Sequence, residues 1–166
     1  ALGLGANLGN PPATVRRVAR VLCHGGKNAV RRFDAEGVDD CRQMHALVDT
    51  NLECAYGCVG LGTCVRACPY GAIAFHDGVP SVDEALCTTC GKCVAACPKE
   101  LIALLPKGQP VYVGCSTRDR GQVVMRACAV GCIACGKCVK VCPKGAINLV
   151  DNLAIIDYDL CDSCGA

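Results

Sequence analysis

Cysteines in closely spaced runs are the feature that most constrains what this chain can fold into. The chain has 166 residues and 18 cysteines, and most of the cysteines lie in CxxCxxC or CxxxCP patterns. A disulfide framework spreads its cysteines so that distant segments are joined, whereas thiols this close along the chain are badly placed to bridge each other. The pattern therefore favours bound metal over a disulfide scaffold.

Large side chains are scarce for a chain of this length. It has 2 Phe, 4 Tyr and no Trp, and the cysteines themselves inflate its hydrophobic fraction of 52%. We therefore expect no deep organic core, and bound metal would supply much of the folding free energy. The composition predicts small units, each wrapped around an inorganic core.

An internal repeat organises the chain. A block from Ala19 to Leu104 resembles a block from Pro110 to the end, because CAYGC (54–58) matches CAVGC (128–132) and TCVRACPYGAI matches KCVKVCPKGAI. After each CP, apolar residues on both sides of an Asp-Gly or Asp-Asn turn predict a β-hairpin. The expected strands are 72–75 and 81–82 in the first block, and 146–150 and 153–156 in the second.

These features predict an α+β fold of tandem ferredoxin-like units with two [4Fe-4S] sites each, small β-hairpins and short helices before each CP. Two VxC sequences predict further strands that end at Cys23 and Cys115. The predicted regions are an N-terminal strand and linker region with Cys23 and Cys41 (1–53), a first two-cluster unit (54–105), a connecting segment with Cys115 (106–127) and a second unit truncated at its C-terminus (128–166).

The spacing of the runs indicates iron–sulfur clusters. Three thiolates, each separated by two residues, converge on one Fe4S4 cube, while the cysteine before proline ligates the other cluster of a pair. Zinc sites use CxxC pairs that close into a tetrahedron and need no triple run with a CP partner. Iron–sulfur binding is therefore favoured over zinc.

In the first block, one predicted site is regular and its partner is irregular. The predicted ligands of the regular site are Cys68, Cys87, Cys90 and Cys93. Those of the partner site are Cys58, Cys64, Cys97 and one more thiolate. Leu61 stands where the middle cysteine of that run is expected, so Cys54 is the leading candidate for the missing ligand. Cys128, however, matches Cys54 in a block that needs no replacement.

The second block predicts two more sites, and about four clusters are expected in all. One site has the ligands Cys132, Cys135 and Cys138, and the other has Cys142, Cys161 and Cys164. Because the sequence stops within the run that begins CDSC, we expect the remaining ligands of both sites beyond Ala166.

Four cysteines stay outside these sites: Cys23, Cys41, Cys115 and Cys128. They could bind one further cluster, serve as small buried hydrophobic residues, or exchange roles with the ligands above. His24, His45 and His76 have no ligand-spaced partner, so ordinary surface or core roles are favoured. The sequence contains no Ser/His/Asp arrangement, paired-carboxylate motif or phosphate-binding glycine loop, which predicts a chain that moves electrons and transforms no substrate.

The formal net charge is +2, but bound clusters would make the protein acidic. The basic run 15–21 and the arginines at 31, 32, 118 and 120 are therefore interpreted as a solvated face that offsets cluster charge, or alternatively as a docking patch for an acidic electron carrier. Basic residues are not interleaved with aromatic ones, so no nucleic-acid partner is expected. The opening segment 1–9 is too short to span a bilayer and lacks the features of a signal peptide, which favours a reducing, cytoplasmic setting.

Three segments carry a resemblance to a known family: YGCVGLGTCVRACPYGAI (56–73), CTTCGKCVAACPKELI (87–102) and CIACGKCVKVCPKGAI (132–147). With the VLCHGG and GVDDC sequences, they make the chain similar to the B subunit of the Rnf complex, the ion-translocating ferredoxin:NAD oxidoreductase. The Leu61 substitution within YGCVGLGTC is part of what points to this family.

The resemblance implies an electron-transfer subunit of a redox-driven ion translocase. Such a subunit takes electrons from reduced ferredoxin and passes them through [4Fe-4S] clusters towards other Rnf subunits in a membrane complex. It implies a peripheral position on the cytoplasmic side of the membrane, with any membrane anchor upstream of Ala1. The alternatives are a polyferredoxin subunit of a hydrogenase or dehydrogenase and, from a different class, a zinc-stabilised scaffold.

Overall fold

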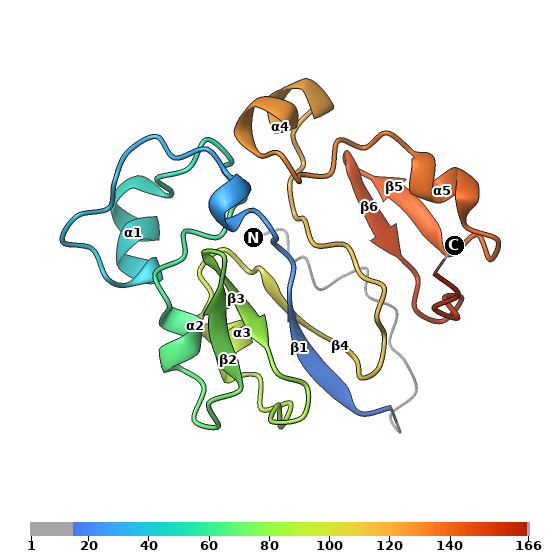
Figure 1. Cartoon of the computed structure of the whole chain (residues 1–166), viewed down its shortest axis with the longest axis horizontal. Helices are drawn as coiled ribbons and strands as arrows, with labels where there is room; N and C mark the ends of the chain where they lie inside the picture. Colours follow the sequence, from blue (N-terminus) through green and yellow to red (C-terminus); the bar gives the residue numbers. More distant parts are fainter. Residues whose placement is uncertain (1–14, 166) are drawn as a thin grey trace.

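A computed structural model describes residues 15–165, which form short helices and three two-stranded antiparallel sheets (Figure 1). This arrangement confirms the predicted α+β class with small hairpins. Within the described residues, every helix falls short of the length and hydropathy needed to cross a membrane. The opening segment 1–9, with its predictions about membrane spans and signal peptides, lies outside the described residues.

Both predicted hairpins are present. The first joins β2 (Ile73–His76) to β3 (Val79–Val82), and the second joins β5 (Ile147–Val150) to β6 (Leu153–Ile156). Each turn contains an aspartate with positive φ, 51° at Asp77 and 47° at Asp151, as expected from the turn chemistry. In Figure 1 the two hairpins lie on opposite sides of the molecule.

The internal repeat extends to individual backbone hydrogen bonds. The N–H of the aspartate that follows each hairpin donates to the carbonyl of the alanine that precedes the same hairpin. The N–H of the next cysteine then donates to the carbonyl of that aspartate. The bonds are Asp83 to Ala72 (2.8 Å) and Cys87 to Asp83 (3.0 Å), repeated as Asp157 to Ala146 (2.8 Å) and Cys161 to Asp157 (3.0 Å). Each hairpin therefore leads its next cysteine run away from the sheet in the same direction.

A third sheet completes the first unit. Strand β1 (Arg17–Val21) pairs antiparallel with β4 (Ile102–Pro106), from Arg17 opposite Pro106 to Val21 opposite Ile102. Val18 is fully buried on this sheet, and Leu101 is 2% exposed beside it. The strand that we assigned to a separate N-terminal region thus packs into the same core as the cysteine runs of the first block.

Short helices follow the cysteine runs, as predicted. They are α2 (Thr63–Arg66), α3 (Lys92–Ala96) and α5 (Lys137–Val141). Each begins after a glycine in the left-handed region, with φ of 78° at Gly62, 73° at Gly91 and 71° at Gly136. A side chain would be strained at these positions, so glycine lets the chain turn directly from a ligand loop into a helix.

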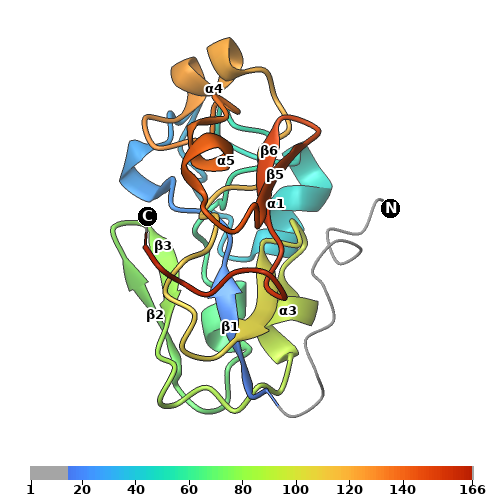
Figure 2. The same ribbon diagram turned by 90° about the vertical axis from the view of Figure 1, so that its right-hand side faces the viewer.

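The remaining helices come from segments outside the repeat patterns. They are the short 3-10 turn η2 (Gly26–Asn28), α1 (Cys41–Val48) and α4 (Gly121–Ala127). Figure 2 shows α4 at one end of the molecule and the β2–β3 hairpin towards the other.

One predicted strand is absent. A strand is present before Cys23, although β1 ends at Val21, two residues earlier than predicted, whereas residues 110–115 form no strand. This segment contacts the residues that follow β1 through a backbone hydrogen bond, which His24 N–H donates to the carbonyl of Gly114 (3.0 Å). A side chain on Gly114 would collide with the His24 ring, at 2.5 Å, so the two segments cross closely here.

We expect Leu101→Ala to lower the free energy of unfolding by about 2–5 kcal/mol, because it opens a cavity between the β1–β4 sheet and the cysteine runs. The measurement is anaerobic guanidinium unfolding followed by circular dichroism. The control is Leu47→Ala, since Leu47 is 66% exposed. Equal midpoints for the two variants would contradict this account of the core.

Candidate metal centres

The first group of cysteines meets where it was predicted to meet. A cavity that is partly open to solvent, with about 340 Å³ of empty space when the open solvent is included, is lined by Cys68, Cys87, Cys90 and Cys93. The backbone N–H of Ala19 in β1 donates to Cys87 Sγ (3.5 Å), and Leu104 of β4 also lines the cavity. The β1–β4 sheet thus forms an apolar wall beside these thiols.

The second group differs from the prediction in one member. A cavity of similar size is lined by Cys41, Cys58, Cys64 and Cys97. Cys54 does not line it, so our expectation that Cys54 replaces the ligand missing at Leu61 is corrected. Cys41, which the spacing left unassigned, occupies that place because helix α1 begins at this residue and reaches the cavity from outside the run.

Helix capping explains how Cys41 is held. Asp40 is the N-cap of α1, and its carboxylate accepts hydrogen bonds from the N–H of Arg42 (2.7 Å) and from the hydroxyl of Thr63 (3.1 Å). The same hydroxyl oxygen accepts a bond from the Cys41 N–H (2.8 Å). Because Thr63 precedes Cys64, this network fixes one cysteine relative to the other. The available sequence signal for this site was an N-cap residue, Asp40, followed by a cysteine at the first position of a helix.

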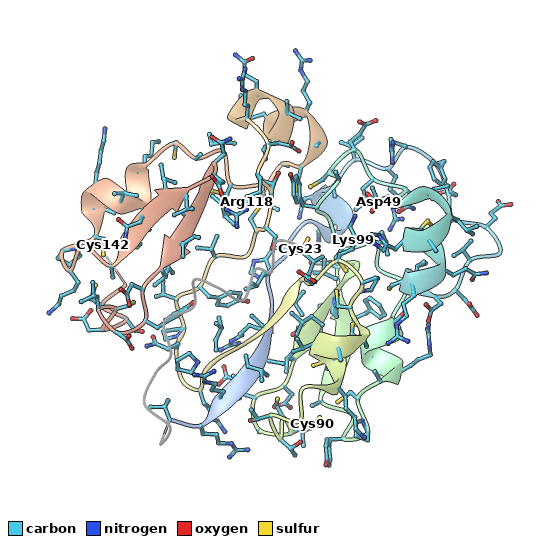
Figure 3. The ribbon with its side chains drawn as sticks, turned by 180° about the vertical axis from the view of Figure 1, so that it is seen from behind. Cys23, Asp49, Cys90, Lys99, Arg118 and Cys142 are labelled. Carbon is cyan, nitrogen blue, oxygen red and sulfur yellow. The ribbon has the colours of Figure 1, made fainter. Side chains whose placement is uncertain are left out.

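The third group brings Cys54 together with three cysteines that the spacing left unassigned. Its cavity has about 380 Å³ of empty space and is lined by Cys23, Cys54, Cys115 and Cys128. Figure 3 shows Cys23 near the centre of the molecule, Cys142 at the left edge and Cys90 at the bottom, each away from Cys23. Cys54 and three of the cysteines that the spacing left unassigned thus line one cavity.

Cys142 of the second block lies beside the β5–β6 hairpin (Figure 3). An ion pair between Lys144 and Asp162 (3.2 Å) joins the loop after Cys142 to the run that contains Cys161 and Cys164. The grouping of those three cysteines stays a prediction. The other predicted group is Cys132, Cys135 and Cys138, of which Cys135 is exposed.

Burial raises the pKa of several of these thiols. Burial, with neighbouring cysteines as a smaller cause, raises the pKa of Cys54 to about 11, of Cys58 to about 12 and of Cys64 to about 11. Metal binding must therefore displace protons from these sulfurs.

The donor sets fit iron–sulfur clusters. Each of the three cavities is lined by sulfur from four cysteines and by apolar side chains. Within residues 15–165, no group of three or more His, Cys, Asp or Glu side chains is arranged to hold a single metal ion. A cubane differs from a single ion because each thiolate binds a different iron.

The basic run is more deeply integrated than a solvated face. Arg20 forms an ion pair with Glu84, and its guanidinium lies 5.2 Å from the centre of the Tyr112 ring. Arg16 donates to the carbonyl oxygen of Cys87 (3.1 Å). The interpretation of this run as solvated is therefore wrong for Arg20, which joins the first unit to the segment that follows it.

The histidines have ordinary polar contacts. His24 hydrogen-bonds with the Tyr112 hydroxyl (2.9 Å), and His45 pairs with Asp49, the C-cap residue of α1 (2.8 Å). Asp49 also pairs with Lys99 (2.8 Å), two residues beyond Cys97 (Figure 3). His76 ends strand β2 on the surface.

Comparison with known proteins assigns these cysteine runs to a family. Residues 53–101 and 86–146, together more than half of the chain, each match the 4Fe-4S dicluster domain. The chain belongs to the 4Fe-4S dicluster domain family. It therefore binds several [4Fe-4S] clusters, which confirms the predicted cofactor, and it is an iron–sulfur protein of the electron-transport class.

Three curated proteins are similar over most of the chain. The B subunit of the proton-translocating ferredoxin:NAD(+) oxidoreductase complex of Clostridium ljungdahlii is 47% identical over 92% of this chain and 55% of its own length. The B subunit of the ion-translocating oxidoreductase complex of Methanosarcina acetivorans is 45% identical over 88% and 56%. The B subunit of the Na(+)-translocating ferredoxin:NAD(+) oxidoreductase complex of Acetobacterium woodii is 44% identical over 92% and 46%. The chain spans about half the length of these relatives.

We expect Asp40→Ala to weaken cluster binding at the Cys41 group while sparing the other groups. Losing the cap costs about 1 kcal/mol, which corresponds to about fivefold faster iron loss if the whole effect falls on that step. The measurement is the rate of iron release to a chelator, with EPR of the reduced protein to identify the cluster that is lost. The control is Asp34→Ala, because Asp34 is exposed. Equal release rates would contradict the role assigned to the cap.

Proposed function

We propose that this chain is an electron-transfer subunit that accepts electrons from reduced ferredoxin and relays them through [4Fe-4S] clusters within a membrane-bound, ion-translocating ferredoxin:NAD oxidoreductase, the Rnf complex. The names of its relatives support the complex and the place of the chain within it. Its position would be peripheral, on the cytoplasmic side of the membrane, in contact with other Rnf subunits. The chain itself would carry no substrate-transforming site.

The observation that carries this proposal is the exchange of ligands between neighbouring runs. Cys68 follows Cys64 in one run but shares a cavity with Cys87, whereas Cys97 follows Cys93 in the other run but shares a cavity with Cys58. This crossing is the arrangement by which two-cluster ferredoxins hold a pair of clusters close together. It supports one-electron transfer between adjacent clusters of one unit.

The proposed ligand sets follow from this crossing and from the corrected position of Cys54. The first unit uses Cys68, Cys87, Cys90 and Cys93 for one cluster and Cys41, Cys58, Cys64 and Cys97 for the other. The second unit uses Cys132, Cys135 and Cys138 for one cluster and Cys142, Cys161 and Cys164 for the other, each with a further ligand. The region around residues 106–127 connects the units.

In this function the residues of the chain bind the clusters, shield them from water and stabilise the negative charge on their sulfur ligands. Clusters, when bound, supply one-electron chemistry in which no bond of a substrate is made or broken. The N–H groups of Ala19 and Leu101 donate to Cys87 Sγ (3.5 Å) and Cys97 Sγ (3.4 Å), and such bonds stabilise negative charge on ligand sulfur. Apolar residues such as Leu104 and Ile102 limit the access of water to the two cavities.

Cys41→Ser is expected to remove one cluster, about four irons with their sulfides, and to leave the cluster of Cys68, Cys87, Cys90 and Cys93 intact. The measurements are iron and acid-labile sulfide per chain and EPR of the reduced protein. Cys90→Ser is the matched control and should remove the other cluster instead. Full iron content in Cys41→Ser would refute the ligand assignment, and stoichiometric zinc without sulfide in the unaltered chain would refute iron–sulfur binding as a whole.

Reduced ferredoxin is expected to bleach the visible absorbance of the oxidised, cluster-loaded chain, because each ferredoxin cluster gives up one electron and one cluster of this chain takes it up. Stopped-flow mixing under anaerobic conditions measures this transfer, and the Cys41→Ser/Cys90→Ser variant should lose the part of the bleaching that the two clusters of the first unit contribute. A chain that dithionite reduces but reduced ferredoxin does not would contradict the proposed donor. Co-purification with hydrogenase subunits, in place of Rnf subunits, would contradict the proposed complex.

A further inference from the structure

The cavity of the third group lies where the two blocks of the repeat meet. Cys23 and Cys54 come from the first block, and Cys115 and Cys128 come from the connecting segment and the second block. The crossing rule for two-cluster units assigns none of these cysteines to the clusters of either unit. The site therefore needs an explanation beyond the function proposed above.

The sulfurs of this group face a shared space. Gly25 is buried between them, and the position that a Cβ on Gly25 would take lies 3.5 Å from Cys23 Sγ and 3.7 Å from Cys128 Sγ. Two sulfurs from distant parts of the sequence are thus close to one point. Gly114 precedes Cys115 on another wall of the same cavity, and the remaining lining includes apolar residues such as Val124 and polar ones such as His24 and Thr117.

The two blocks contribute to this cavity in the same way. The N–H of Cys58 donates to Cys23 Sγ (3.4 Å), and the N–H of Cys132 donates to Cys115 Sγ (3.3 Å). Cys58 and Cys132 occupy matching positions of the repeat. Each of these sulfurs therefore already receives the kind of amide hydrogen bond that stabilises a thiolate ligand of a cluster.

The other two cysteines also occupy matching positions. Gly57 N–H donates to the carbonyl of Cys54 (3.0 Å), and Gly131 N–H donates to the carbonyl of Cys128 (3.4 Å). Each CAxGC segment thus makes the same tight turn at the cavity. The site thus has two similar halves, one from each block of the repeat, and each half contributes one pair of cysteines.

A short segment connects both turns through the backbone. Val30 N–H donates to the carbonyl of Ala127 (2.9 Å), and the Val30 carbonyl accepts from Glu53 N–H (2.9 Å). Ala129 N–H donates to the carbonyl of Asn28 (3.0 Å) on the same segment. Residues 28–30 therefore bond to the chain beside Cys54 and to the chain beside Cys128, which fixes the separation of these two cysteines.

We propose that Cys23, Cys54, Cys115 and Cys128 bind a further [4Fe-4S] cluster at the junction of the two units. On binding, each thiol gives its proton to solvent and forms one Fe–S bond, so four thiolates hold the cluster without any exchange of electrons. This assignment goes beyond the function proposed above and requires only that the chain binds iron–sulfur clusters, whichever donor and complex it serves. The cluster then ties the connecting segment and the second block to the first block.

The test is a set of paired substitutions with iron and acid-labile sulfide measured per chain. Cys115→Ser and Cys128→Ser should each lose about four irons, and the double variant should lose no more than either, because both residues hold one cluster. Cys115→Ser combined with Cys41→Ser should lose about eight irons, because these residues hold different clusters. Unchanged iron in Cys115→Ser, or additive losses in Cys115→Ser/Cys128→Ser with the EPR signal of the Cys90 group retained, would overturn the proposal.

A second measurement needs no substitution and so does not depend on the folding of a variant. The cluster-loaded chain is treated with iodoacetamide before and after chelation of its iron, and modified cysteines are identified by mass spectrometry. Cys23, Cys54, Cys115 and Cys128 should be protected until iron is removed. Rapid modification of these four in the loaded chain, while Cys68 and Cys87 stay protected, would overturn the proposal, as would zinc bound at this site without sulfide.

These results are independent of the test with ferredoxin. A chain that lacks the junction cluster but is still reduced by ferredoxin would refute this inference alone. A chain that keeps the junction cluster but accepts no electrons from ferredoxin would refute the proposed function alone.

Discussion

The structure depends on bringing sulfur atoms from distant segments to the surface of one small cavity. Regular secondary structure is sparse, and the sheets have two strands each, so backbone pairing alone does not form an extensive framework. In the first unit, the β1–β4 sheet and the cysteine runs share one buried cluster of side chains in which cysteines take places that larger residues fill in other proteins. Formation of the metal centres and formation of the core are thus parts of the same process.

Backbone amides support this arrangement at every cavity. Donors from strand β1, from the residue before β4 and from the first cysteines of two runs point at ligand sulfurs. Because the donors belong to the backbone, their positions follow from the fold and survive changes of side chain. A thiolate is therefore stabilised by the same turns that fix its position, which links the geometry of the hairpins and loops to the chemistry of the sites.

Local sequence patterns predicted the local parts of the structure. The hairpins, their aspartate turns and the short helices after glycine followed from spacing and turn chemistry within about ten residues. The same spacing predicted that Cys68 would meet Cys87, Cys90 and Cys93. It failed where a cavity-lining cysteine comes from a distant segment: Cys41 reaches its cavity through the cap of helix α1, and no spacing rule connects it with Cys58. Cys54 was misplaced because its proximity in sequence to Leu61 suggested a local substitution. The strand predicted for residues 110–115 is absent because this segment contacts the first unit where it crosses His24 at Gly114, and it forms no series of paired backbone hydrogen bonds with a neighbouring strand.

The distribution of cavity-lining cysteines along the sequence has a consequence for biosynthesis. All eight cysteines that line the first two cavities lie between Cys41 and Cys97, and strand β4 follows at once to close that unit. The third cavity already has Cys23 and Cys54 at that stage, but its last cysteine is present only when Cys128 has been translated. Since domains fold in order as they leave the ribosome, the first unit would be complete while half of the junction still waits for its partner segment. In the nascent chain, the thiols of Cys23 and Cys54 are thus present before the other two cysteines of their cavity have been translated.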